Sequence, residues 1–185
     1  MGSSYENLMV LGGSEARVRQ VLAGTGSLMT AEAGGVLVVF HEERMGDEGL
    51  LEALSAAATV LHFAVLDDDL LLCGLWRGGE LRYEICVPDP ARYFGEELDG
   101  PDGAEPGGAD DGTGVERSAR AYAIGVGSGD PERAIGVLDG DYVFATERHR
   151  DLLEALGLPT FVAGWGLQYL TDQRDNYDGP ELFTT

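Results

Sequence analysis

Two kinds of hydrophobic pattern alternate along the first part of the chain. Short apolar or alternating runs are typical of strands, and the segments between them carry apolar residues every three or four positions, as amphipathic helices do. The predicted strands are 6–11, 27–32, 36–42 and 59–66, and the predicted helices are 15–23 and 47–57. The order β-α-β-β-α-β predicts a ferredoxin-like plait, in which two helices cover one face of an antiparallel sheet.

Residues 70–87 carry the clearest hairpin signal, with two strand-like runs around the glycine pair at 78–79. Glycine supplies the positive φ angles that a two-residue hairpin turn needs. A regular register from this turn places Cys73 opposite Glu84 and only diagonal to Cys86, which does not suit a disulfide. We therefore expect the hairpin to extend the sheet of the plait, with both cysteines reduced.

The composition changes sharply at residues 95–116, which contain acidic residues, glycine and proline but no basic residue. Such a segment buries too little apolar surface to offset its chain entropy, so it is predicted to be a disordered acidic loop. It separates residues 1–94, the plait with its hairpin, from residues 117–185.

Residues 117–185 are predicted to form a β-α-α-β block. Its strands are expected at 119–126 and 161–170, and its helices at 131–138 and 147–156, followed by a loose polar tail. This block is too small for a separate domain. The predicted fold class is therefore α+β, with the C-terminal block packed on the plait and extending one mainly antiparallel sheet.

The charge of the chain is strongly negative. There are 33 acidic residues against 12 basic ones, all of them arginine, and the net charge is −21. Because phosphate and anionic lipid are bound by basic residues, neither nucleic acid nor a membrane is an expected partner. The initial residues have no leader pattern and no apolar run is long enough to span a membrane, so we expect a cytoplasmic protein.

Candidate metal ligands are His41, His62, Asp67 and Asp69, because imidazole and carboxylate groups bind transition metals. No zinc-binding spacing accompanies them, and the alternative interpretation of the Asp67–Asp69 run is a solvated turn. His149 is expected on the solvent-facing side of its helix. No catalytic residue and no cofactor is predicted: the glycine-rich segment 125–130 contains no lysine to bind phosphate, and the cysteines have no cationic neighbour in sequence.

Two segments carry a resemblance. The string WRGGELRYEICVPDPARYF at 76–94 and the string VFATERHRDLLEALGLP at 143–159 are similar to uncharacterised prokaryotic proteins. The use of arginine in place of all lysine resembles the composition of proteins from salt-loving archaea or from high-GC bacteria. The archaeal resemblance implies salt adaptation, and none of these resemblances implies an activity.

The sequence favours a non-enzymatic protein that acts by binding another protein, as an immunity-like or regulatory module. The alternative is a small-molecule sensor or a metal-dependent enzyme that uses His41, His62 and the Asp67–Asp69 run. The two hypotheses predict different structures, because the alternative requires these side chains to line one pocket.

Overall fold

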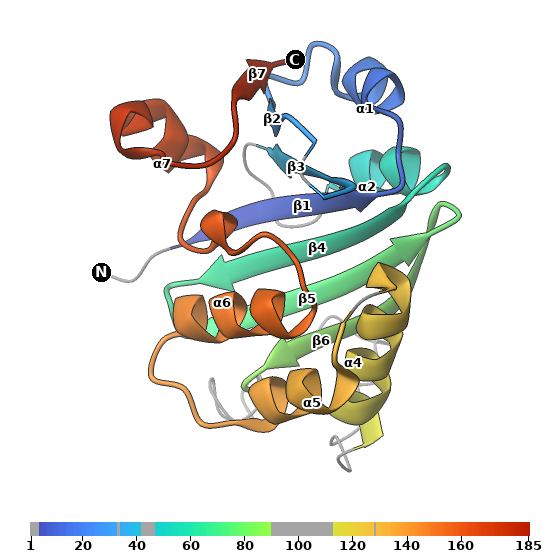
Figure 1. Ribbon diagram of the computed structural model, residues 1–185, viewed down its shortest axis with the longest axis vertical. Coiled ribbons are helices and arrows are strands. Elements are labelled where there is room, and N and C mark those ends of the chain that lie inside the picture. The colour runs from blue at the N-terminus through green and yellow to red at the C-terminus, as the bar shows by residue number, and fades with distance from the viewer. Residues whose placement is uncertain (1–3, 33, 42–46, 90–112, 128) are drawn as a thin grey trace, which may run out of the picture.

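The computed structural model describes residues 4–32, 34–41, 47–89, 113–127 and 129–185. Of the predicted acidic loop 95–116, only residues 113–116 lie within this part, and they begin a helix, Thr113–Val126, so the prediction was wrong for these four residues. The described residues form an α+β fold around one seven-stranded sheet, in the order β6-β5-β4-β1-β3-β2-β7 (Figure 1). Every pair of neighbouring strands is antiparallel. The predicted α+β class and mainly antiparallel sheet are confirmed.

The strands are β1 (Tyr5–Leu11), β2 (Leu28–Thr30), β3 (Val36–Phe40), β4 (Thr59–Leu66), β5 (Leu70–Arg77), β6 (Glu80–Val87) and β7 (Leu182–Thr184). The helices are α1 (Glu15–Leu22), α2 (Glu48–Ser55), α4 (Thr113–Val126), α5 (Pro131–Asp139), α6 (Ala145–Ala155) and α7 (Leu167–Asp172). Short 3₁₀ turns, η1 (Thr160–Val162) and η2 (Arg174–Asn176), flank α7.

The first block follows local signals in the sequence. Ser14 caps α1 by accepting a hydrogen bond from the backbone of Arg17, and Asp47 caps α2 in the same way through Leu50. The strands of the predicted hairpin, β5 and β6, begin and end at the predicted limits. The limits agree because neighbouring residues in the sequence determine these turns and helix caps.

The C-terminal block differs from its prediction. Segment 119–126 is part of helix α4, whose buried residues Ala119, Tyr122 and Ala123 recur at helical spacing. Segment 161–170 is not a strand either, because η1 and α7 occupy it and Gly164 between them has a φ of 90°. The block therefore adds helices to the sheet where two strands were predicted.

The C-terminal tail contributes the last strand of the sheet. β7 pairs with β2, with Leu28 opposite Thr184 and Met29 opposite Phe183. The prediction of a loose tail at 171–185 was wrong for this segment. The sheet is thus extended at both edges, by the hairpin on one side and by β7 on the other.

A bulge near the turn changes the predicted register of the β5–β6 hairpin. Beyond it, Cys73 lies opposite Ile85 instead of Glu84, and Cys86 lies opposite Leu72. One extra residue in β6 displaces every later pair by one position. Both cysteines are free, as expected.

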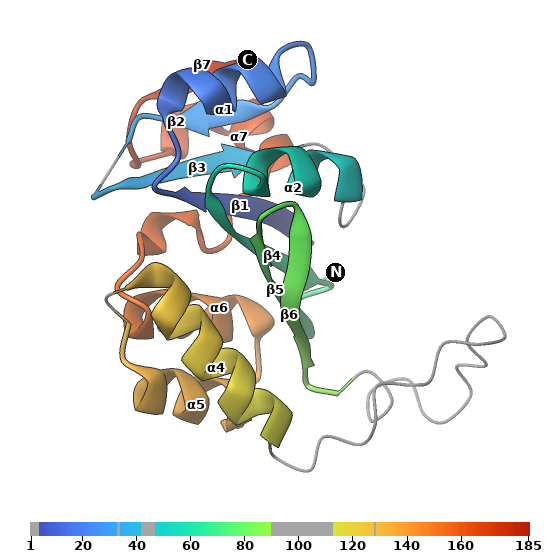
Figure 2. The same ribbon diagram turned by 90° about the vertical axis from the view of Figure 1, so that its right-hand side faces the viewer.

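Helices cover both faces of the sheet and create two cores (Figure 2). On one face, here called the α1/α2 face, Leu8, Val60 and Leu51 pack with the two N-terminal helices. The other face, the α4–α6 face, buries Phe63 and Leu152 among many others.

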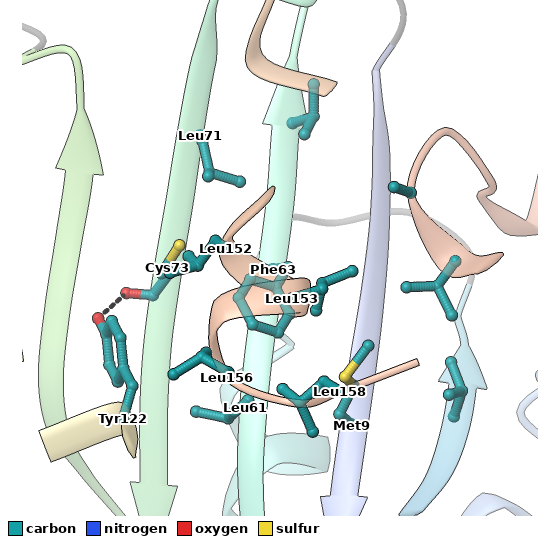
Figure 3. Packing of buried hydrophobic residues seen from close by; sticks show 14 of the residues in the cluster. Met9, Leu61, Phe63, Leu71, Cys73, Tyr122, Leu152, Leu153, Leu156 and Leu158 are labelled. Atoms are coloured by element: carbon teal, nitrogen blue, oxygen red, sulfur yellow. Dashed lines mark hydrogen bonds between the residues drawn. The ribbon is translucent and has the colours of Figure 1, made fainter. Parts of the chain in front are cut away.

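The α4–α6 face includes a buried contact between a helix and the strand backbone. The hydroxyl of Tyr122 on α4 donates a 2.7 Å hydrogen bond to the carbonyl oxygen of Cys73 on β5 (Figure 3). Burial raises the pKa of Cys73 well above its usual value, so this thiol stays protonated and unreactive.

Candidate functional site

The Asp67–Asp69 turn is a structural anchor for helix α6. Asp67 and Asp68 have φ angles of 48° and 63°, in the region that Asp and Asn tolerate best after glycine. The Asp68 carbonyl oxygen accepts a 2.7 Å hydrogen bond from the Ala145 amide, and its Oδ1 accepts a 2.9 Å bond from the Thr146 amide. The residue at the N-cap, Phe144, provides no side-chain cap of its own. Asp68 therefore caps α6 from a different part of the chain.

This anchor fixes two exposed apolar residues, Val143 and Phe144, which we call the 143–144 tip. Their exposed fractions are 76% and 49%. Exposed acidic residues lie near the tip: Asp139, Asp141 and Glu147 in sequence, and Asp67 and Asp69 in the anchoring turn. The tip is thus a small apolar surface with an acidic rim.

The residues beside the tip are also held by specific contacts. Arg148 is 5% exposed, donates a 2.6 Å hydrogen bond to the carbonyl oxygen of Gly140, and lies over the ring of Tyr142. The Tyr142 hydroxyl donates to Asp151 at 2.8 Å. Burial lowers the pKa of Arg148, although arginine remains charged at any physiological pH. The segment between α5 and α6 therefore has little freedom to move.

His149 is fully buried, so its predicted place on the solvent-facing side of α6 was wrong. Its Nδ1 lies 2.9 Å from the hydroxyl of Tyr5, and its ring lies 4.7 Å from that of Phe63. Burial, assisted by the charge of Arg150, lowers the pKa of His149 to about 3. The residue is neutral at physiological pH and belongs to the core between α6 and the sheet.

His62 lies on the opposite face of the sheet from these contacts. It is 3% exposed, and its Nε2 is 3.2 Å from Oε1 of Glu6 on the neighbouring strand. By strand alternation both side chains point to the α1/α2 face, with Leu8 and Val60. Asp68, by contrast, bonds to α6 on the other face.

His41 forms a separate set of contacts. Its Nδ1 is 2.8 Å from the hydroxyl of Ser27, and its Nε2 is 3.8 Å from Oδ2 of Asp47. His62, His41 and the turn that contains Asp67 and Asp69 thus take part in three separate sets of contacts. Among the residues that the structure describes, no three His, Cys, Asp or Glu side chains are grouped so that they could hold a metal ion.

Two further features of the described residues have the position or shape of a binding site. The aspartate of the glycine-rich segment, Asp130, caps α5 by accepting hydrogen bonds from the amides of Glu132 and Arg133, which places a carboxylate where an anion would bind. A cavity of about 240 Å³ is lined by residues of α1 and α2 and of the segments beside them, mainly small apolar side chains together with Arg17. Neither feature presents a buried polar group to a ligand.

The 143–144 tip was not found by sequence reasoning. The available signal was local: two large apolar residues follow Asp141 and precede a helix that has no capping side chain. That Asp68 supplies the cap, and that the tip stays exposed, depends on contacts across 78 residues of chain.

Comparison with protein-family models, with curated proteins and with solved structures finds no match to this chain. No helix in the described ranges is long and apolar enough to cross a membrane.

Proposed function

We propose that this protein acts by binding another protein, as a regulatory or immunity-like module, and that the 143–144 tip is the centre of the contact surface. The observation that carries the proposal is the adjacent exposure of Val143 and Phe144 on a segment that the rest of the fold holds in place. Single exposed apolar side chains are normal and need no explanation. An adjacent aliphatic and aromatic pair, rigidly presented, has the composition of an interface core.

Rigidity matters because ordering a flexible loop on binding reduces affinity. The hydrogen bonds from Asp68 to α6 and from Arg148 to Gly140 fix the segment before any partner arrives. The acidic rim defines the chemistry of the partner, which is an apolar pocket bordered by arginine or lysine. Nucleic acid and anionic membrane are disfavoured by the same charge.

We also infer that residues 1–94 contain a ferredoxin-like plait. The supporting observation is the strand order β4-β1-β3-β2 within the sheet, with α1 following β1 and α2 following β3. This fold hosts many unrelated functions, so it does not itself favour enzyme or binding module. The inference concerns architecture alone.

The acidic excess is consistent with a cytoplasmic protein adapted to high salt. At about 1 M salt the Debye length is only ~3 Å, so repulsion among carboxylates is screened while their hydration remains. We expect the free energy of unfolding to rise between about 0.1 M and about 1 M salt. A stability that does not change with salt would contradict this adaptation.

The protein-binding proposal is tested by affinity capture from a lysate of the source organism at high salt, with three baits. The wild-type chain is compared with Val143→Asp/Phe144→Asp and with Ile124→Asp. Ile124 is the matched control, because it is 78% exposed on α4 but stands alone. We expect a protein retained by the wild type and by Ile124→Asp to be lost with the double variant. Identical proteins on all three baits, or none on any, would contradict the proposal.

One specific observation favours the alternative function, which is a ligand or metal site. His62 is buried and lies 3.2 Å from the largely covered Glu6 on the α1/α2 face, and His41 directly follows β3, the strand next to β1. Titration with Zn²⁺ by calorimetry, on the wild type and on His62→Ala, tests this reading. Stoichiometric binding that His62→Ala abolishes would favour the alternative over the protein-binding proposal.

A further inference from the structure

The cavity of about 240 Å³ beside α1 and α2, which we call the α1/α2 cavity, has apolar walls. None of its lining residues carries a buried polar atom without a hydrogen-bond partner. A site for a polar small molecule has a few such groups that fix the orientation of the ligand. The composition of this cavity therefore favours an apolar side chain as its occupant. The apolar lining residues are Val18, Val21, Ala53, Leu54, Ala57 and Ala58.

A phenyl ring matches the α1/α2 cavity in size. An apolar cavity of ~150 Å³ accepts benzene, so about 240 Å³ is enough for a phenylalanine ring together with part of a second side chain. At the 143–144 tip, Phe144 and Val143 are 49% and 76% exposed. The same chain therefore carries an exposed phenyl ring and a cavity that fits one.

Arg17 gives the α1/α2 cavity a positive charge. Its Nη1 donates a 2.9 Å hydrogen bond to the neutral side chain of Gln20, and Arg17 forms no ion pair with any described residue. Arg19, by contrast, pairs with Glu15 at 2.8 Å. The guanidinium of Arg17 thus keeps donors for an additional carboxylate. The acidic rim of the 143–144 tip supplies carboxylates beside Phe144.

The cavity and the tip are too far apart to meet within one copy. Ala58, which lines the cavity, directly precedes β4, and Asp68, which anchors the tip, lies in the turn that follows β4. A strand of 8 residues spans roughly 25 Å. Helices α2 and α6, which adjoin the cavity and the tip, also cover opposite faces of the sheet (Figure 2). A tip that enters the cavity therefore comes from another molecule.

We propose that the 143–144 tip of one copy of this chain docks in the α1/α2 cavity of a second copy, with the Phe144 ring in the cavity and Arg17 of the second copy beside the acidic rim. The inference rests on the proposed role of the tip as a contact surface and adds that its partner is a second copy. Two different surfaces meet, so the contact is heterologous, and further copies add to the free tip and the free cavity.

The net charge of −21 on each copy opposes this association at low ionic strength. In molar salt the long-range repulsion is screened, whereas burial of the phenyl ring and the contact of Arg17 with a carboxylate act at short range. Self-association is therefore expected to strengthen as the salt concentration rises.

Sedimentation equilibrium in molar salt tests the docking with variants that block one surface each. We expect the wild type to self-associate, and Phe144→Asp on the tip and Ala57→Glu in the cavity each to weaken association by about tenfold or more. An equimolar mixture of the two variants should form a dimer with one copy of each and nothing larger. Phe144→Asp keeps its cavity and Ala57→Glu keeps its tip, so exactly one contact remains possible.

Two matched controls separate the docking from the general effect of charge. Ala56→Glu adds the same charge as Ala57→Glu at a neighbouring exposed position that does not line the cavity, and it should leave association unchanged. Arg17→Gln should weaken association about two- to fivefold, as expected for an exposed ion pair. Arg19→Gln removes the same charge outside the cavity and should have no effect. Circular dichroism checks that every variant is folded.

Three results would overturn the inference: a wild type that stays monomeric in molar salt, association that Ala57→Glu leaves unchanged, or a mixture of the two blocked variants that forms no dimer. The protein-binding proposal fails separately. If the tip retained a different protein from the lysate, and Ala57→Glu retained it equally well, that proposal would stand while the docking between copies would be wrong.

Discussion

The two faces of the sheet are covered in different ways. On the α1/α2 face, helices that directly follow β1 and β3 pack mainly through apolar side chains, apart from a backbone hydrogen bond from Gly78 to Ser55 at the end of α2. On the α4–α6 face, helices from the distal part of the chain are tied to strands by polar contacts. Examples are Tyr122 to β5, His149 to β1, and Asp68 to α6.

This difference indicates how the distal helices find one position. Apolar packing alone permits a helix to slide or rotate over a sheet, whereas a buried hydrogen bond with a fixed partner does not. Helices α4 to α6 therefore have a defined position on the sheet. The 143–144 tip directly precedes α6, so it is held in a defined position as well.

The largest effect is expected from cavities in the two cores. Leu152→Ala on the α4–α6 face and Leu51→Ala on the α1/α2 face should each lower the free energy of unfolding by about 3 kcal/mol. Urea unfolding followed separately at Trp76 and Trp165 measures this, because these residues report on different faces. Coincident transitions are expected; if Leu152→Ala shifted only the Trp165 signal, the faces would be independent units.

Acid should destabilise the α4–α6 face through His149. Its pKa is about 3 in the folded chain against an ordinary value of 6.5, so the unfolded state binds the extra proton between these pH values. The stability contributed by neutral His149 is present above pH 6.5 and is lost as pH falls. Below about pH 6, wild type should lose about 1.4 kcal/mol per pH unit more than His149→Phe. If the free energy of unfolding of the wild type and of His149→Phe fell equally with pH, the buried neutral His149 would not be the cause of the acid sensitivity.

Removing the Tyr122 hydroxyl should have an intermediate effect. Tyr122→Phe leaves the buried carbonyl of Cys73 without its donor, and we expect a loss of about 1–2 kcal/mol in chemical denaturation. Tyr142→Phe is the comparison, because its hydroxyl bonds Asp151 in a half-buried position where water can replace it. Equal losses for the two variants would show that the Tyr122 contact has no special role in positioning α4.

The smallest effect is expected at the anchor of the tip. Asp68→Ala should cost about 1 kcal/mol, since it removes the side-chain cap of α6. Asp68→Asn keeps an acceptor oxygen and tolerates the positive φ, so it should stay close to wild type. Hydrogen exchange at the Thr146 amide should accelerate in the alanine variant and not in the asparagine variant. Unchanged exchange at the Thr146 amide in both variants would show that Asp68 does not anchor α6.

The sequence predicted those parts of the fold that local chemistry determines. The Gly78-Gly79 pair predicted the hairpin turn, and the two helices predicted at 15–23 and 47–57 begin next to the capping residues Ser14 and Asp47. The strand predicted at 119–126 failed because AYAIGV fits both periods, and only Tyr122 packing on β5 makes the helical spacing decisive. Tertiary context overrides weak local preference in such segments.

The candidate site shows the same limit. The Asp67–Asp69 run forms the turn between β4 and β5, as one of its two interpretations predicted, but the partner of this turn, the start of α6, lies far away in sequence. His149 sits between two arginines, a pattern typical of a solvated helix face, and its burial follows from Tyr5 and Phe63 on the strands. No periodicity within α6 reveals those partners.

The central claim, that the 143–144 tip contacts a partner protein, is tested most directly by site-specific photo-crosslinking. A benzophenone amino acid replaces Phe144 in one sample and Ile124 in another, and both are irradiated in a lysate of the source organism at high salt. The account predicts one discrete protein adduct from position 144 and none from position 124. Adducts of the same proteins from both positions, or from position 124 alone, would contradict it.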